Sequence, residues 1–144
     1  MCTRLRRGLL AAGFGLLAVP AHAACTVDAR PVSFGAVDVA RVTFSTGRID
    51  VVCDEAATVS VALSGSGNGQ RAMIGPGGSR LVYELFTDAT YRRVWGDGQG
   101  NGVPVQTSIA AGGRQRLTVY GVVPAQPGVP AGQYAAQLVI SITF

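Results

Sequence analysis

The sequence lacks the side chains on which most enzymes depend. It contains no lysine, and its only histidine, His22, lies among the first 23 residues. A nucleophilic serine or cysteine needs a neighbouring base whose pKa is near neutrality, and a zinc site needs imidazole or thiolate ligands. The adjacent carboxylates Asp54 and Glu55 do not form an acid–base pair, because neighbouring residues of a strand point to opposite faces. We therefore expect neither a secreted hydrolase nor a cofactor or metal site.

Long hydrophobic runs are also scarce, and the first one has the marks of an export signal. Three arginines precede an apolar run from Leu9 to Val19, and the small-x-small sequence Ala21-His22-Ala23 follows it. This pattern predicts a signal peptide over residues 1–23 and a mature domain over residues 24–144. The run is too short to span a bilayer, so we expect an exported protein without membrane insertion. A lipid anchor at Cys25 is disfavoured, because His22 stands where such signals carry an aliphatic residue.

The excess of positive charge disappears with the signal peptide. The chain has 12 basic and 8 acidic residues, and three of the arginines but none of the acids lie in the signal. The near balance that remains gives no reason to expect nucleic acid or anionic lipid as a partner. Of the three cysteines, Cys2 also belongs to the signal. We expect Cys25 and Cys53 to form one disulfide in an oxidising compartment, the alternative being two free thiols.

Helical periodicity is missing after residue 24, and period-two alternation takes its place. Apolar and polar residues alternate in runs over residues 48–53, 58–63, 81–85, 117–120 and 133–144, separated by glycine- and proline-rich stretches. Short strands with such turns predict a single antiparallel β-sandwich of the all-β class. The last run stops at Phe144 in the middle of its alternation. It is either the final strand of a complete sandwich or a strand whose partner is absent.

The loop "RVWGDGQGNG", residues 93–102, gathers ligand-like residues beside the only tryptophan, Trp95. It has some features of a calcium loop, but the bidentate glutamate and the flanking helices are missing. A phosphate loop would need a helix to follow it. We therefore predict a turn in which Trp95 packs on the sandwich and Asp97-Gly98 reverses the chain.

Five stretches follow one another in a telling order: "CTVDARPVSFG" (25–35), "GRIDVVCD" (47–54), "QRAMIGPGG" (70–78), "LVYELFTDATYRRVWGDG" (81–98) and "LTVYGVVPAQPGVPAGQYAAQLVISITF" (117–144). In this order and spacing the chain resembles the spore coat protein U domain, which is also the pilin-type domain of archaic chaperone-usher pili. The resemblance covers nearly the whole mature chain. It implies an immunoglobulin-like sandwich that lacks its last strand, with a disulfide joining the first two strands at Cys25 and Cys53.

The resemblance also implies partners and a binding groove. Such pilins are held in the periplasm by a dedicated chaperone, pass an outer-membrane usher and accept a donor strand from the neighbouring pilin subunit. We therefore expect periplasmic transit and then a place in a pilus or coat at the cell surface. The groove residues that the resemblance carries over are Val32, Phe34, Tyr134, Ala136, Leu138, Ile140, Ile142 and Phe144.

One departure from the family pattern concerns the N-terminus. Polymerising members carry an alternating apolar stretch of a dozen or so residues before the first cysteine. Here the first mature cysteine is only the second residue after the predicted cleavage site. This arrangement favours a terminal or tip-like subunit that accepts a strand without donating one, or a coat component that does not polymerise in this way.

The competing hypothesis is a complete, monomeric secreted β-sandwich that binds a ligand such as carbohydrate. Its candidate stacking residues are Trp95, Tyr91 and Tyr83. Arg92 and Arg93 beside Tyr91 are then either part of a stacking or anion-binding site or a solvated strand edge that discourages unwanted pairing.

Overall fold

The alternating apolar side chains form a core between two sheets. The structure, a computed structural model, describes residues 23–64, 70–100 and 102–144. In strand β2 (Thr43–Cys53), Ile49, Val51 and Cys53 are at most 2% exposed. Strand β3 (Ala57–Leu63) contributes a matching buried row to the same core. Because every second residue of a strand faces the same side, this pattern packs one sheet against the other.

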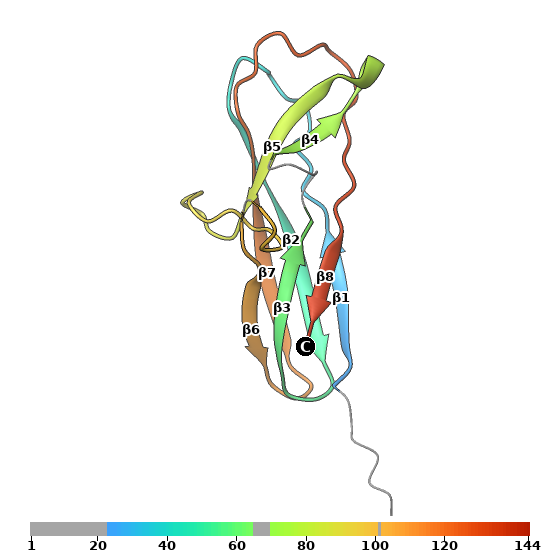
Figure 1. Ribbon diagram of the computed structural model, residues 1–144, viewed down its shortest axis with the longest axis vertical. Helices are drawn as coiled ribbons and strands as arrows, with labels where there is room; N and C mark the ends of the chain where they lie inside the picture. The colour runs from blue at the N-terminus through green and yellow to red at the C-terminus, as the bar shows by residue number, and fades with distance from the viewer. Residues whose placement is uncertain (1–22, 65–69, 101) are drawn as a thin grey trace, which may run out of the picture.

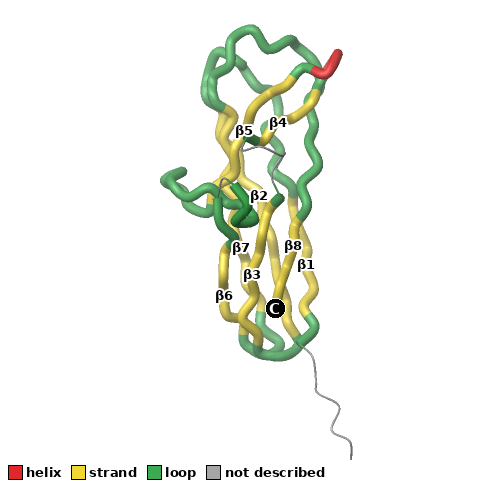
Figure 2. The backbone as a smooth tube through the Cα atoms, in the orientation of Figure 1, coloured by secondary structure: helices red, strands yellow, loops and turns green. Residues whose placement is uncertain are grey.

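All ladders within the two sheets are antiparallel (Figure 1). The larger sheet has the order β1 (Cys25–Arg30), β2, β7 (Arg114–Val123), β5 (Arg80–Phe86) and β4 (Arg71–Ile74). The smaller sheet has the order β6 (Val105–Ile109), β3 and β8 (Ile140–Thr143). Figure 2 shows loops and one 3₁₀ turn, η1 (Pro76–Gly78), at the end beyond β4 and β5. The described residues contain no α-helix, and the predicted all-β, immunoglobulin-like sandwich is confirmed.

The predicted disulfide is also confirmed. Cys25 and Cys53 lie opposite each other in the register of β1 and β2, and their sulfur atoms are bonded. The backbone extends this closure, because the Asp54 amide donates to the Ala24 carbonyl at 3.0 Å and the Ala24 amide donates to the Asp54 carboxylate at 2.7 Å. Except for Ala23, the signal peptide predicted over residues 1–23 lies outside the described residues and stays a prediction. The described part of the chain contains no helix that could span a membrane.

The prediction of one continuous last strand over residues 133–144 was wrong in its extent. Ala135 bridges to Ile74 at the edge of β4, with N···O distances of 2.8 and 3.1 Å. Regular pairing begins only at β8, which pairs with β3 in the other sheet. The segment therefore passes from one sheet to the other, and a chain that changes sheets cannot keep a single ladder.

Each sheet has one of its edge strands on the same side of the molecule. Among the described strands, β1 pairs only with β2, and β8 pairs only with β3. Figure 1 shows blue β1 and red β8 on that side, with the chain that follows β1 and the chain that precedes β8 continuing toward the end where β4 and β5 lie. These two continuations enclose the candidate site.

Candidate functional site: an apolar cleft between two unpaired segments

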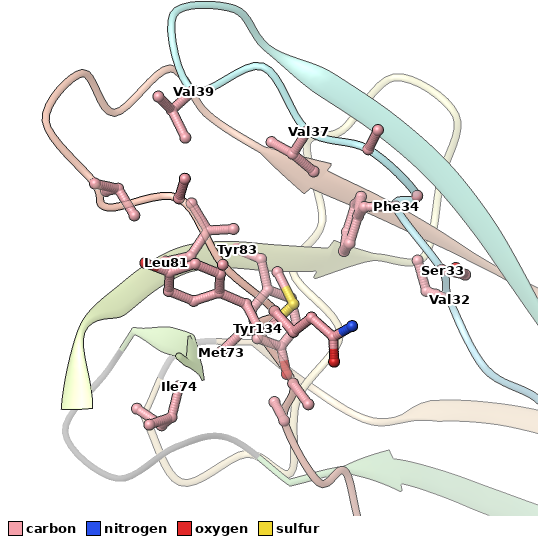
Figure 3. Close-up of a pocket in the computed structure, with 18 of the residues that line it drawn as sticks. Val32, Ser33, Phe34, Val37, Val39, Met73, Ile74, Leu81, Tyr83 and Tyr134 are labelled. Atoms are coloured by element: carbon pink, nitrogen blue, oxygen red, sulfur yellow. The ribbon is translucent and has the colours of Figure 1, made fainter. Parts of the chain in front are cut away.

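An apolar cleft of about 1110 Å³ lies between residues 31–39 and residues 129–138. Figure 3 shows its side chains converging from three parts of the chain, with Phe34 and Val37 on one wall, Tyr134 on the other and Tyr83 of β5 on the floor. The floor also includes Met73 of β4 and Leu81 and Leu85 of β5. Burial raises the pKa of Tyr83 above its ordinary value of 10.0, so its phenol is neutral at physiological pH.

Two glycines allow the first wall, residues 31–39, to lie close against the larger sheet. A Cβ atom at Gly121 of β7 would stand 2.8 Å from Phe34 Cζ and from Val32 Cγ1, and one at Gly47 of β2 would stand 2.8 Å from Val32 Cγ2. These distances are too short for any larger residue to be accommodated without movement of the wall. The ring of Phe34 then meets Tyr83 edge-on, with centroids 6.3 Å apart, and the first wall is anchored to the floor.

Tyr134 fixes the part of the second wall, residues 129–138, that lies beside β4. The Tyr134 hydroxyl donates to the Pro130 carbonyl at 2.6 Å and lies 2.9 Å from the Ser79 hydroxyl. Its ring covers Gly75 so closely that a Cβ atom there would collide with it. Together with the bridge between Ala135 and Ile74, these contacts fix the wall beside β4.

The facing walls have backbone groups without partners. The amides of residues 32–37 and 136–138 donate to no other residue in the described ranges. Among the described residues, one hydrogen bond reaches the backbone of residues 32–37: the Ser45 hydroxyl donates to the Ser33 carbonyl at 2.5 Å. Unpaired backbone on both sides of an apolar cleft is the arrangement into which an extended segment can add as a strand.

The cleft brings together five of the eight predicted groove residues: Val32, Phe34, Tyr134, Ala136 and Leu138. The other three lie elsewhere. Ile140 and Ile142 belong to β8 and pack against the core of the sandwich, whereas Phe144 is 59% exposed beyond the end of β8. The alternation that suggested one groove-lining face thus continues past the end of the cleft.

Sequence reasoning missed the floor of the cleft and half of the first wall. Val37 and Val39 also line the cleft, and they repeat the x-apolar alternation of Val32 and Phe34 with its phase shifted by one residue. Gly35, whose φ of +63° lies in the left-handed region, stands between the two pairs and resets the phase. In the sequence, a glycine between two short alternating apolar pairs was the signal that could have revealed the second half of the first wall.

Of the loop that the sequence singled out, residues 93–100 and 102 are described and Asn101 lies outside the described residues; the described part has a structural role. Trp95 is 1% exposed, and its indole N–H donates to the Val61 carbonyl at 2.9 Å. Asp97 accepts a hydrogen bond from the Gln99 amide at 2.8 Å, and Gly98 follows it with a φ of +83°, which makes a turn. Within the described residues no group of three or more histidine, cysteine or acidic side chains could hold a metal ion.

Trp95 does not stack on a ligand, because its side chain is 1% exposed in the hydrophobic core. Tyr83 is 8% exposed and lies on the floor of the cleft, so a ligand meets its ring only from inside the cleft. Tyr91 alone of the three candidates is on the surface, where it joins a cluster of rings.

Beneath the cleft, a buried arginine ties β4 to its neighbours. Arg71 is 4% exposed and forms an ion pair with Glu84. It also donates to the carbonyls of Leu63, Ser64 and Trp95. A buried guanidinium needs several acceptors to offset its desolvation, and here they come from β5, from the end of β3 and from the turn after Trp95.

Comparisons with known proteins agree with this architecture. The family model described as "Spore Coat Protein U domain" matches residues 14–141. A curated relative, Protein U of Myxococcus xanthus, is 38% identical over 64 residues, which is 44% of this chain and 34% of that protein. The chain thus spans about a third of the length of that relative.

A solved structure shares the fold. The crystal structure of the CsuC–CsuE chaperone–tip adhesion subunit pre-assembly complex, from the archaic chaperone-usher Csu pili of Acinetobacter baumannii, contains a chain that matches with a TM-score of 0.61. The match covers 85% of this chain and 40% of that one, at 20% identity. The family model covers most of the sequence, and the sandwich has the same fold as a chain of a pilus assembly complex. This protein belongs to the Spore Coat Protein U domain family.

Proposed function

We propose that this protein is an exported structural or adhesive subunit of a chaperone-usher pilus or surface coat, and that its cleft accepts an extended donor strand from another protein. The observation that carries the proposal is the pair of facing segments, residues 32–37 and 136–138, whose backbone amides have no partner in the described structure. The complex that shares the fold, a chaperone with a tip adhesion subunit, is consistent with this role.

The chemistry of the cleft defines the occupant. It is an extended segment, because only extended backbone can pair with both walls at once. Every second side chain is apolar, because those side chains meet Phe34, Leu138 and Tyr83 inside the cleft. Each fully buried valine-, leucine- or phenylalanine-sized side chain contributes about 1.5–3 kcal/mol, so a few of them account for tight binding.

The cleft requires a strand from a partner, and the likeness to a chaperone–subunit complex is the ground on which we propose the following partners. A periplasmic chaperone fills the cleft during transit, an outer-membrane usher receives the complex, and a neighbouring subunit supplies the final strand. The place of the subunit in a fibre depends on its mature N-terminus. If mass spectrometry finds the mature start at Ala24, as the sequence predicts, no donor segment precedes Cys25, and the subunit is terminal or tip-like.

The test compares Leu138, the last residue of the second wall, with Val139, which follows it and lies outside the wall. Leu138 lines the cleft, whereas Val139 is 60% exposed and does not. The full-length precursor is co-expressed with the chaperone encoded nearest to it, so that the exported subunit can be captured from the periplasm. We expect Leu138→Glu to abolish capture and Val139→Glu to leave it unchanged.

A second measurement does not depend on any variant. In the captured complex, hydrogen exchange at the amides of residues 32–37 and 136–138 is expected to slow by at least tenfold relative to the free subunit. The amides of β3 in the core serve as the reference. Unchanged exchange at both walls in the presence of the chaperone, or equal capture of the two glutamate variants, would contradict the proposal.

A further inference from the structure

A cluster of four aromatic rings lies on the outer face of the larger sheet. It contains Phe44 of β2, Phe86 of β5, Tyr120 of β7 and Tyr91 from the loop after β5. The centroid of the Tyr91 ring lies 5.0 Å from that of Phe44, 5.6 Å from that of Phe86 and 6.2 Å from that of Tyr120. Because the cleft uses the inward-facing residues of β5 and the cluster uses an outward-facing one, the two surfaces are separate.

The loop that carries Tyr91 is built around the carboxylate of Asp88. This carboxylate accepts hydrogen bonds from the amides of Thr90, Arg92 and Arg93, at 3.2, 3.3 and 2.9 Å, and from the Thr90 hydroxyl. The Thr87 amide closes the loop by donating to the Arg93 carbonyl at 2.9 Å. The loop is therefore held in one shape with Tyr91 over the sheet.

Tyr91 itself adopts a backbone conformation that side chains disfavour. Its φ is +55°, and it is the only non-glycine residue in the described ranges with a positive φ. Such a conformation persists only where the surroundings enforce it, and it often marks a functional position. Here it directs one ring against Phe44, which is 57% exposed although it is a large apolar residue.

Two arginines without an ion-pair partner among the described residues directly follow Tyr91 in the chain. Arg92 and Arg93 are exposed and form no ion pair with any described residue. On the same sheet face, Arg48 and Arg116 share the single carboxylate of Asp50, each at 2.8 Å, so half of their positive charge is neutralised. Arg92 and Arg93 have no such partner among the described residues, and they follow Tyr91 directly in the chain.

We propose that Phe44 and Tyr91, together with Arg92 and Arg93, bind an acidic polysaccharide. The C–H face of a sugar ring carries partial positive charge and stacks on the negative face of an aromatic ring. The guanidinium groups supply paired donors for the sugar carboxylates. The site is independent of strand acceptance and gives the subunit a surface for glycan contact.

The test uses galacturonic acid hexamers as the probe and maltohexaose as the neutral reference. Binding to the mature protein, free or captured by its chaperone, is measured by calorimetry. We expect millimolar or tighter binding of the acidic hexamer and at least tenfold weaker binding of the neutral one. Phe44→Ala and the double variant Arg92→Gln/Arg93→Gln each lower the affinity at least tenfold, and the matched control Arg30→Gln/Arg114→Gln leaves it within twofold.

Other outcomes overturn the proposal. If both arginine double variants lose the same affinity for the acidic hexamer, charge alone attracts it. Anionic vesicles or single-stranded oligonucleotides that bind as tightly as the hexamer would lead to the same conclusion. No binding of the hexamer at 10 mM (about 10 times a weak millimolar dissociation constant) also overturns it. Leu138→Glu serves to separate the two proposals, because it disrupts the cleft and leaves glycan binding unchanged.

Discussion

Replacing the buried Arg71 by methionine is expected to destabilise the sandwich more than the same substitution at an exposed arginine. Arg71 is almost fully buried, and its guanidinium bonds three backbone carbonyls and the Glu84 carboxylate. Methionine fills most of the same volume, so the loss is chiefly one of polar partners. The carbonyls of Leu63 and Trp95 would then lie in the interior with no donor from this side chain.

The expected loss in the free energy of unfolding can be worked out from the hydrogen-bond and ion-pair partners of Arg71. A buried acceptor left without a donor costs about 1–3 kcal/mol, and breaking a buried ion pair by removing one member costs about 3–5 kcal/mol. Glu84 is 21% exposed and its Oε1 also accepts the Leu85 amide at 2.9 Å, so part of its charge stays solvated. We therefore expect a loss of about 3–5 kcal/mol in the free energy of unfolding, which is a large share of the ~5–15 kcal/mol typical of a domain.

Urea unfolding of the mature chain, followed by tryptophan fluorescence, measures this loss. Trp95 is the single tryptophan and is buried, and its carbonyl is one of the acceptors of Arg71. Arg114→Met is the control, because Arg114 is exposed and forms no ion pair with a described residue. The control is expected to change stability by less than about 0.5 kcal/mol. A loss below about 1 kcal/mol for Arg71→Met would show that the buried network contributes no more than a surface charge.

Three further perturbations have defined outcomes. Replacing Cys25 and Cys53 by alanine opens a loop of sequence separation 28 and is expected to cost about 3–4 kcal/mol on the chain-entropy model; an unchanged urea midpoint would contradict this. The pKa of Asp50 lies below its ordinary value of 3.8, mainly because Arg116 donates a hydrogen bond to its carboxylate. The native state thus favours the ionised form, so this contribution to stability is complete above about pH 4 and is lost as the pH falls through the lowered pKa. Asp50→Asn should flatten the acid limb of the stability profile, and an identical limb would refute the assignment. Gly121→Ala places a Cβ atom against the first wall of the cleft, should cost about 1–3 kcal/mol by overpacking and should weaken chaperone capture; full capture would mean that the wall moves freely.

The strands of the core could be predicted from the sequence because their alternation and their burial have the same cause. In β2 and β3 every second residue faces the opposite sheet, and the buried rows match the predicted ones. The C-terminal run misled the prediction for a related reason. Tyr134, Leu138 and Ile140 all pack toward the core. Their alternation therefore reflects burial on one side of the chain and does not indicate one continuous strand, because regular pairing begins only at Ile140.

The cleft was less accessible to prediction. The family resemblance indicated both walls, but the floor comes from β4 and β5, whose place beneath the walls depends on the strand order. The close seating of the first wall depends on Gly47 and Gly121, which meet Val32 and Phe34 only in three dimensions. The ring cluster was hidden in the same way. Phe44 and Tyr120 share a face only through the register of β2 and β7, and Tyr91 reaches them from the loop after β5.

The two walls of the cleft come from opposite ends of the folded sequence, residues 31–39 and 129–138. The first wall has nothing to face across the cleft until the second wall, which lies far along the chain, has folded beside it. Domains dominated by such distant contacts fold slowly, in milliseconds to seconds. A partner that has to contact both walls would therefore bind only chains in which these two distant segments have come together.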